Sequence, residues 1–288
     1  MVRDTVVEVP GENGVYDDIP DHVYHGDTAS LSSSGARAIL KSPAQFRYEQ
    51  DHPRPPKKAF DFGHAAHSLV LGAGAELREI PVRLLASNGA VSTKEAKAFV
   101  AQARADGAVA LKPEEYAQVH AMAAKLLEHP YAKALMQAEG QAEQSIYTTD
   151  PDTGVRLRSR PDWMTRPGPR LLVVDYKSTT DADPRVFERH AADFGYHCQN
   201  AWYLDQVIAA GIDDDPEFLF IAQSKEPPYL VSVTRFGPED VEEGRRRNRR
   251  AINTFADCNR TGQWPGWEHD IYPISLPKWA FTEEDYSE

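Results

Sequence analysis

The chain has little cysteine, no long hydrophobic run and a shortage of positive charge. Its 288 residues include only 2 cysteines, Cys198 and Cys258. This number excludes a disulfide framework and a four-cysteine iron–sulfur cluster within one chain, so we expect a reducing, cytoplasmic compartment. No apolar stretch is long enough to cross a bilayer, and no signal sequence opens the chain, so we expect no membrane partner.

Negative charge dominates the composition. The formal net charge is −12 and the sequence pI is about 5.3, so the chain lacks the basic footprint that is typical of a nucleic-acid binder. Part of the excess acid lies in GENGVYDDIPDH near the start and FTEEDYSE at the end. Basic residues are clustered in RRRNRR, residues 245–250, and between residues 41 and 58. Either cluster could follow phosphates, but the arginine run could also be a solvated helix face paired with Glu242 and Glu243.

The segment LLVVDYKST, residues 171–179, is a buried type of strand that ends in a carboxylate, one residue and a lysine. Side chains alternate along a strand, so Asp175 and Lys177 share a face while Tyr176 points the other way. Placing an acid and an amine at the end of an apolar strand is costly unless they pair, bind a metal or act on a substrate. A surface ion pair is the plainer interpretation.

A second strand supplies another carboxylate. Asp162 lies in RSRPDWM, just before the apolar strand. Two carboxylates can hold a hard divalent cation, and a neighbouring lysine can orient or help to deprotonate an attacking water. Asp162 could instead form a structural ion pair with Arg158 or Arg160.

Two further segments carry side chains at helical spacing. FDFGHAAHSLVLG, residues 60–72, places His64 and His67 one turn apart. His67 could be a core histidine, and the pair could bind zinc, although no cysteine or HExxH pattern supports zinc. GYHCQNAWYLD, residues 195–205, places Tyr196, Gln199 and Tyr203 on one stripe.

Taken in chain order, these four segments resemble the motifs of the PDDEXK nuclease superfamily. The resemblance is closest to the RecB-type and phage exodeoxyribonuclease VIII-like branch. The motifs are G-x-x-x-H, R-P-D, D-x-K and Q-x-x-x-Y, carried by Gly63 and His67, by residues 160–162, by Asp175 and Lys177, and by Gln199 and Tyr203. The resemblance runs from about Leu31 to Gly262. The superfamily pattern usually has glutamate where this chain has Asp175, a variant that is common in the RecB-type branch.

The resemblance implies a hydrolase that cleaves DNA phosphodiester bonds with one or two Mg²⁺ or Mn²⁺ ions, without an iron–sulfur cluster. The implied metal ligands are Asp162, Asp175, the backbone carbonyl of Tyr176, His67 and, in second rank, Glu143. Lys177 would orient the water, either through an ammonium pKa lowered by burial or through the charge that it places beside the phosphate. Gln199 and Tyr203 would contact this lysine and the DNA backbone, and the residues expected to contact DNA are Tyr196, Gln199, Tyr203, Arg246, Arg249 and Arg250. If the arginines are not used, the basic residues nearest the segment of His67 are Arg37, Lys41, Arg47, Lys57 and Lys58.

The resemblance also implies partners and a source. It favours an exonuclease that degrades duplex DNA from its ends in phage or prophage recombination, in a bacterial host cytoplasm, with a single-strand annealing protein as partner and a homo-oligomeric ring as assembly. Two alternatives stay open. One is a catalytically idle DNA-binding or assembly protein on a nuclease fold, and the other is a structure-specific or RNA-directed nuclease, because fold and metal site do not fix the substrate.

The predicted fold class is mixed α/β, with a PDDEXK core whose central mixed sheet is flanked by helices, and a helical N-terminal part. The run SLSSSGARAILKSPAQFRYEQ, residues 30–50, predicts a helix with a serine N-cap and a second helix that restarts at Ser42-Pro43. We expect further helices at 93–105, 113–139, 184–210 and 238–260. A hairpin within residues 142–163 precedes the strand at 171–179, and two further strands are separated by Glu226-Pro227-Pro228. The predicted division is an extension at 1–30, a nuclease domain at 31–262 (helical part 31–140, catalytic core 141–262) and a tail at 263–288.

Overall fold

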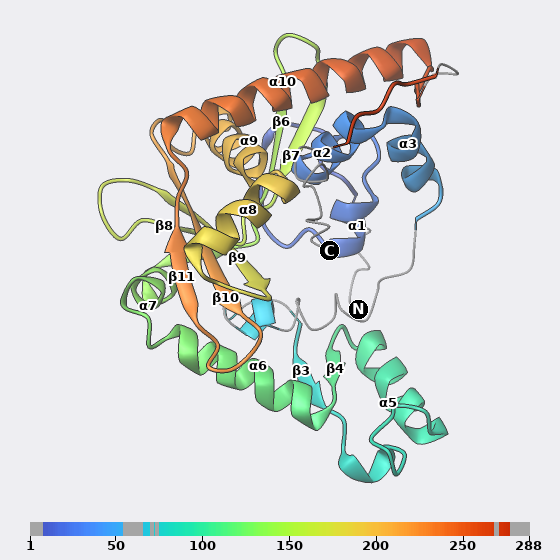
Figure 1. Ribbon diagram of the computed structural model, residues 1–288, viewed down its shortest axis with the longest axis vertical. Helices are drawn as coiled ribbons and strands as arrows, with labels where there is room; N and C mark the ends of the chain where they lie inside the picture. Colours follow the sequence, from blue (N-terminus) through green and yellow to red (C-terminus); the bar gives the residue numbers. More distant parts are fainter. Residues whose placement is uncertain (1–7, 54–65, 70–71, 73–74, 268–270, 277–288) are drawn as a thin grey trace, which may run out of the picture.

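A five-stranded mixed sheet with helices on both faces forms the centre of the protein (Figure 1). The computed structural model describes residues 8–53, 66–69, 72, 75–267 and 271–276. This arrangement confirms the predicted mixed α/β class, in which an element with one apolar face must bury that face against another layer.

The described strands and helices follow the order expected for the core, with additional short strands. The strands are β1 (Gly14–Tyr16), β2 (Leu31–Ser32), β3 (Leu77–Glu79), β4 (Val109–Leu111), β5 (Gly140–Ala142), β6 (Ser145–Thr149), β7 (Arg156–Ser159), β8 (Trp163–Thr165), β9 (Leu172–Thr179), β10 (Glu217–Ser224) and β11 (Val231–Thr234). The helices are α1 (Asp21–Gly26), α2 (Ser33–Lys41), α3 (Pro43–Asp51), α5 (Lys94–Ala105), α6 (Pro113–Leu126), α7 (Pro130–Gln137), α8 (Pro184–Phe194), α9 (Tyr196–Ala209) and α10 (Pro238–Thr261).

The central sheet has the strand order β11-β10-β9-β8-β5. Strands β9 and β10 are parallel, and their register sets Asp175 beside Phe220 and Lys177 beside Ala222. A parallel pair needs a crossover connection, which α8 and α9 supply. Strand β8 runs antiparallel to β9 with Trp163 opposite Val174, so Asp162, one residue before β8, lies next to the polar end of β9.

The two faces of this sheet are covered by different helices. Phe187 of α8 and Leu204 of α9 pack with Val173 on one face. On the other face, residues of α6 and α7 pack with Val174 and Tyr176. Because side chains alternate, Asp175 and Lys177 point toward the α8–α9 side. The predicted opposition of Tyr176 to these two residues is confirmed.

A second sheet, with the order β1-β6-β7-β2, lies beside a helical layer of α2, α3 and α10. Helix α10 crosses α9 very closely at Gly244, where an added Cβ would lie 2.3 Å from the carbonyl oxygen of His197. No side chain fits there without moving the helices apart. This close contact fixes the position of α9, which carries Gln199 and Tyr203, between the central sheet and α10.

The N-terminal elements belong to the same packed body. Strand β1 pairs with β6, and Asp21 of α1 forms an ion pair with Arg160 at 2.7 Å. Strands β3 and β4 form a parallel pair that, with α5, projects at the bottom of Figure 1. The division of the chain into extension, nuclease domain and tail stays a prediction.

Helix boundaries correct two sequence-based predictions. The segment predicted as one helix over 113–139 is two, α6 and α7, because Pro130 begins a new helix that is N-capped by His129. The segment predicted as one helix over 184–210 is also two, because Gly195 has φ +66° and ends α8. The helices predicted to start after serine caps are confirmed, with Ser32 and Ser42 accepting hydrogen bonds in the first turns of α2 and α3.

Candidate active site

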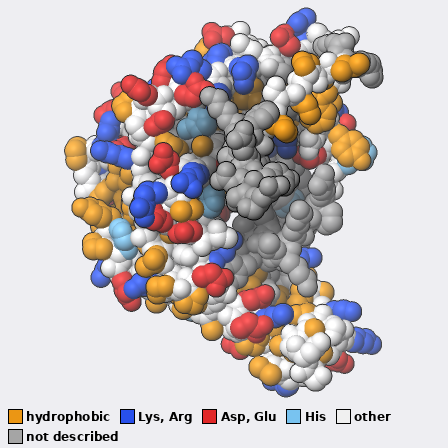
Figure 2. Space-filling view, viewed as in Figure 1, with side chains coloured by type: hydrophobic (Ala, Val, Ile, Leu, Met, Phe, Trp, Pro, Cys, Tyr) orange, Lys and Arg blue, Asp and Glu red, His pale blue; other side chains and the backbone are white. Residues whose placement is uncertain are grey.

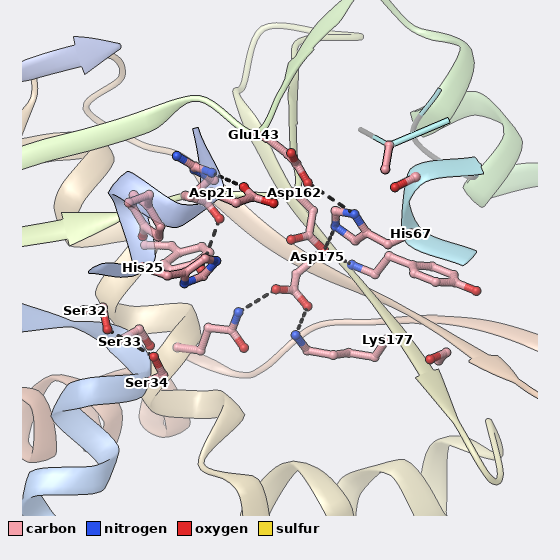
Figure 3. Close-up of a pocket in the computed structure, with 18 of the residues that line it drawn as sticks. Asp21, His25, Ser32, Ser33, Ser34, His67, Glu143, Asp162, Asp175 and Lys177 are labelled. Carbon is pink, nitrogen blue, oxygen red and sulfur yellow. Dashed lines mark hydrogen bonds and ion pairs between the residues drawn. The ribbon is translucent and has the colours of Figure 1, made fainter. Parts of the chain in front are cut away.

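A pocket of about 580 Å³ opens at the polar end of β9. Its lining brings together side chains that are far apart in sequence, from α2, from the helical residues 66–69, from β9 and from α9 (Figure 3). The predicted residues His67, Glu143, Asp162, Asp175, Lys177, Gln199 and Tyr203 all line it. His64 and Gly63 lie outside the described residues.

Asp175 and Lys177 form the base of the pocket. Asp175 is only 1% exposed; its Oδ1 accepts a hydrogen bond from Gln199 Nε2 at 2.5 Å, and its Oδ2 lies 2.5 Å from Lys177 Nζ. Burial and the nearby Asp162 raise the pKa of Asp175 to about 6, against the effect of Lys177. Burial alone would lower the pKa of Lys177, but Asp175 and Asp162 outweigh it and raise that pKa. The lysine is therefore a charged ammonium. Of the two roles predicted for Lys177, the one that requires a pKa lowered by burial is wrong.

Asp162, His67 and Glu143 form the opposite wall. The backbone N–H of Tyr176 donates to Asp162 Oδ2 at 2.8 Å. His67 Nε2 lies 3.0 Å from the same oxygen, and His67 Nδ1 lies 3.4 Å from Glu143 Oε1. Burial opposes a charge on His67, but Asp162 and Glu143 raise its pKa to about 9. An imidazolium with both nitrogens facing carboxylates is the form that this geometry favours.

The structure decides between two interpretations of Asp162. The arginines with which it could have paired are held elsewhere: Arg158 donates to the backbone and hydroxyl oxygens of Ser30, and Arg160 pairs with Asp21. Asp162 faces His67 instead. Burial raises the pKa of Asp162, but His67 and Lys177 outweigh burial and lower it.

The stripe on α9 supports the acids. Gln199 hydrogen-bonds Asp175 rather than Lys177, so its predicted contact with the lysine is wrong. The ring of Tyr196 lies 5.2 Å from Lys177 Nζ in a cation–π contact. Tyr203 donates its hydroxyl to the carbonyl oxygen of Arg160 at 3.2 Å, which ties α9 to the strand connection that carries Asp162.

Comparison with known families supplies the decisive observation. Residues 32–269 match the family model described as a PDDEXK-like domain of unknown function, DUF3799. The chain belongs to this PDDEXK-like family. The match covers residues from α2 to beyond the end of α10, and it confirms the PDDEXK assignment and the fold class made from the sequence.

Solved structures share the fold at low sequence identity. A protein from Eubacterium rectale named "Putative exonuclease" aligns with a TM-score of 0.59 and 12% identity, over 92% of this chain and 98% of that chain. The structure named SSO0001 aligns with a TM-score of 0.35 and 10% identity, over 80% of this chain and 76% of that one, which is too dissimilar to carry an argument. No curated protein matches the chain. Within the described ranges, no helix is both long and apolar enough to span a membrane.

The donor types of the PDDEXK-like pocket suit a divalent ion, and PDDEXK nucleases generally use one. Asp162 and Asp175 repel each other, and this repulsion helps to raise the pKa of Asp175 to about 6. A bound cation would relieve the repulsion. In the arrangement seen, however, the described part of the chain holds no group of three or more His, Cys, Asp or Glu side chains placed to bind a metal. In this arrangement Asp162 faces His67 and Asp175 faces Lys177. To act as a metal ligand, His67 would have to lose a proton, because only a neutral imidazole nitrogen can bind a metal ion.

The arginines of α10 lie apart from this pocket. Arg246 pairs with Glu243 at 2.6 Å. Arg249 donates through both terminal nitrogens to Asp150, at 2.9 and 2.7 Å, and Arg250 borders a separate shallow pocket with Arg246 and Arg247. Figure 2 shows Lys and Arg side chains interspersed with Asp and Glu over the visible face. The ion pair of Arg246 fits the solvated-face interpretation, and the paired state of Arg249 fits a structural role.

We expect Arg249→Gln to lower the free energy of unfolding by about 1–2 kcal/mol, because it leaves the buried Asp150 carboxylate without its charged partner. This loss is smaller than that expected for breaking a fully buried ion pair. The Arg249 side chain is 43% exposed, so water replaces part of the contact. Burial raises the pKa of Asp150, but Arg249 outweighs it and lowers it. The difference from wild type is therefore complete above about pH 4 and disappears as the pH falls through the lowered pKa.

Urea unfolding of both proteins at several pH values measures this difference. Arg246→Gln, on the same helix, serves as the control and should change stability little. If Arg249→Gln had the stability of wild type and a reduced salt dependence of DNA binding, the predicted contact of Arg249 with DNA would be supported instead of the structural role.

Several pocket residues escaped the sequence analysis. Ser33 of α2 and Lys225, which follows β10, line the same pocket. Arg37, which the sequence offers only as an alternative DNA contact, lines it as well. By itself, the SLSSSG run predicts only a helix cap. The signal that it carries, a serine-rich N-terminus one turn before an arginine, indicates a site only when the fold turns α2 toward β9.

Proposed function

We propose that this protein is a metal-dependent deoxyribonuclease that hydrolyses DNA phosphodiester bonds. The observation that carries the proposal is the convergence of Asp162, Asp175 and Lys177 with His67 and Glu143 in one pocket. The pocket lies at the end of β9 in a PDDEXK-like fold. A structural ion pair would need only Asp175 and Lys177, whereas the second carboxylate and the histidine add a set of ligands.

The chain's own residues position the reaction. Bound at Asp162 and Asp175, with the Tyr176 carbonyl and His67 as further ligands, Mg²⁺ or Mn²⁺ would lower the pKa of the attacking water and neutralise the phosphate. Gln199 holds Asp175 by its hydrogen bond, and the Tyr176 N–H holds Asp162. The Lys177 ammonium stabilises the negative charge that develops as water adds to phosphorus and the bond to the leaving oxygen breaks.

Within this activity we propose an exonuclease that acts on duplex DNA ends in phage or prophage recombination in a bacterial cytoplasm. Two observations support it: the likeness of the motifs to exodeoxyribonuclease VIII-like proteins, and the shared fold with the E. rectale protein named "Putative exonuclease". A single-strand annealing protein as partner and a closed ring of copies belong to the same proposal. A ring encircling DNA would explain how a chain of net charge −12 stays bound to DNA.

Incubation of the purified protein with end-labelled substrates tests the proposal. Linear duplex, circular duplex, single-stranded DNA and RNA are compared with Mg²⁺, with Mn²⁺ and with EDTA. We expect metal-dependent loss of linear duplex from its ends, with circular duplex intact. Cleavage of circles would show an endonuclease, and preferential cleavage of RNA would support the RNA-directed alternative. Binding of DNA without cleavage under any metal condition would support the idle alternative.

A further inference from the structure

The mouth of the pocket on the α2 side carries donors that the acid site does not use. Ser33 lies in the first turn of α2 and Arg37 lies one turn later, so both project from the same face of the helix. Both line the pocket. Ser33 is only 5% exposed, and its hydroxyl has no hydrogen-bond partner among the described residues. A buried hydroxyl without a partner indicates a group that is missing from the site.

This donor set suits an anion. Helix α2 has no acidic residue in its first turn, so the partial positive charge of its N-terminus is not neutralised locally. Among the described residues, Arg37 makes one hydrogen bond, from Nη1 to the carbonyl oxygen of Phe194 at 3.1 Å, and no ion pair. The remaining guanidinium donors are free to bind a phosphate. The chemistry that fits is a phosphodiester group beside the one at Asp162 and Asp175.

Next to Arg37, a stack of aromatic rings runs from the core to the surface. Tyr196 stacks on the buried Phe220 at 5.5 Å, and Phe194 stacks on Tyr196 at 5.8 Å, both with an interplanar angle of 24°. Phe194 is the outermost ring and is 61% exposed. The ring of Tyr196 also contacts Lys177. The stack is therefore tied to the pocket at two points, through Lys177 and through Arg37.

A single exposed aromatic ring on a protein surface needs no explanation. Here the ring belongs to an ordered stack, and its own backbone carbonyl holds the arginine that lines the pocket. Gly195 adds to this arrangement, because it follows Phe194 with φ +66° and an added Cβ would lie 3.0 Å from Arg37 Cδ. The glycine both ends α8 at Phe194 and leaves room for the arginine. Proteins that bind single-stranded nucleic acids combine an aromatic ring, on which a base stacks, with a positively charged group that binds the phosphate.

We propose that Phe194 and Arg37, with the Ser33 hydroxyl, form a subsite for an unpaired nucleotide next to the reacting phosphate. Arg37 and Ser33 bind its phosphate, and its base stacks on Phe194 as the fourth ring of the stack. A base inside a duplex is covered on both faces by its neighbours, so the subsite accepts single-stranded or frayed ends and disfavours a blunt paired end. This inference rests on the proposed nuclease function and extends it to the state of the DNA end.

Fluorescence anisotropy tests the subsite in EDTA, where no cleavage occurs, with a labelled single strand of about 12 nucleotides and a blunt duplex of the same sequence. We expect Phe194→Ala to weaken single-strand binding at least about fivefold and Phe194→Trp to retain it, since base stacking depends on a ring. Blunt-duplex affinity should stay unchanged. Arg37→Gln should reduce the slope of log affinity against log salt by about 0.7.

Tyr131→Ala is the matched control, because Tyr131 is 74% exposed on α7 and contacts a neighbouring histidine as Phe194 does. Helix α7 packs on the opposite face of the sheet from α8, so this variant should bind like wild type. Single-strand binding by Phe194→Ala equal to wild type, or an equal loss for single strand and duplex, would overturn the subsite.

The same proteins are then assayed for cleavage with Mg²⁺, which separates the two proposals. Cleavage by wild type together with unaltered single-strand binding by Phe194→Ala would refute the subsite and leave the nuclease function standing. A selective binding loss in Phe194→Ala without cleavage by wild type would refute the nuclease function and leave a single-strand-binding site.

Discussion

Asp175→Asn is expected to reduce metal-dependent DNA cleavage by at least about a thousandfold, because the amide keeps the shape of the side chain but cannot bind a divalent cation as a carboxylate does. The free energy of unfolding should change by less than about 1 kcal/mol. Two effects oppose each other: repulsion from Asp162 is relieved, while Lys177 loses its closest partner. Steady-state cleavage of linear duplex and urea unfolding measure the two quantities.

Asp205→Asn is the control for this prediction. Asp205 lies on α9 and pairs with Arg245 at 2.9 Å, but it does not line the pocket. Its variant should cleave DNA at the wild-type rate. Wild-type cleavage by Asp175→Asn would remove Asp175 from the site and refute the assignment of β9 as the catalytic strand.

Lys177→Met has the second largest expected effect, a loss of cleavage of at least about a hundredfold with Mn²⁺ binding retained. The methionine fills the volume of the lysine stem but cannot stabilise charge on the phosphate. Removing a cation that lies 2.5 Å from Asp175 should leave metal affinity equal or higher. Titration calorimetry with Mn²⁺ and single-turnover cleavage measure binding and chemistry separately.

Lys125→Met, at a surface lysine paired with Glu128, controls for the loss of one positive charge and should cleave normally. If Lys177→Met lost metal binding and cleavage together, the lysine would be a structural partner of Asp175 and its catalytic role would be wrong.

The sequence predicted strand β9 and the shared face of its two charged side chains, because the signals for both are local. Alternation along β9 places Asp175 and Lys177 on one face, and the pairing of β8 with β9 follows from the short connection between them. His67 joined this group through the family resemblance, since nothing in its own segment distinguishes a ligand from a core histidine. The structure now places it 3.0 Å from Asp162.

What the sequence could not supply depends on long-range packing. Helical periodicity continues through Gly195 on both sides, so the break that exposes Phe194 became visible only with the left-handed glycine. The partner of Arg249, Asp150, lies 99 residues away in sequence, and a run of arginines gives no sign of it. The sequence motif predicts that Gln199 contacts Lys177. In the structure Tyr196, one helical turn earlier on α9, contacts Lys177, and Gln199 hydrogen-bonds Asp175.

Diffraction from a crystal soaked in Mn²⁺ tests whether this pocket binds the divalent ion used for cleavage. We predict an anomalous peak in the pocket, with oxygens of Asp162 and Asp175 and a ring nitrogen of His67 at about 2.0–2.3 Å from the ion. A peak elsewhere, or an empty pocket with the ion pairs of His67 and Lys177 intact, would contradict the proposed metal site.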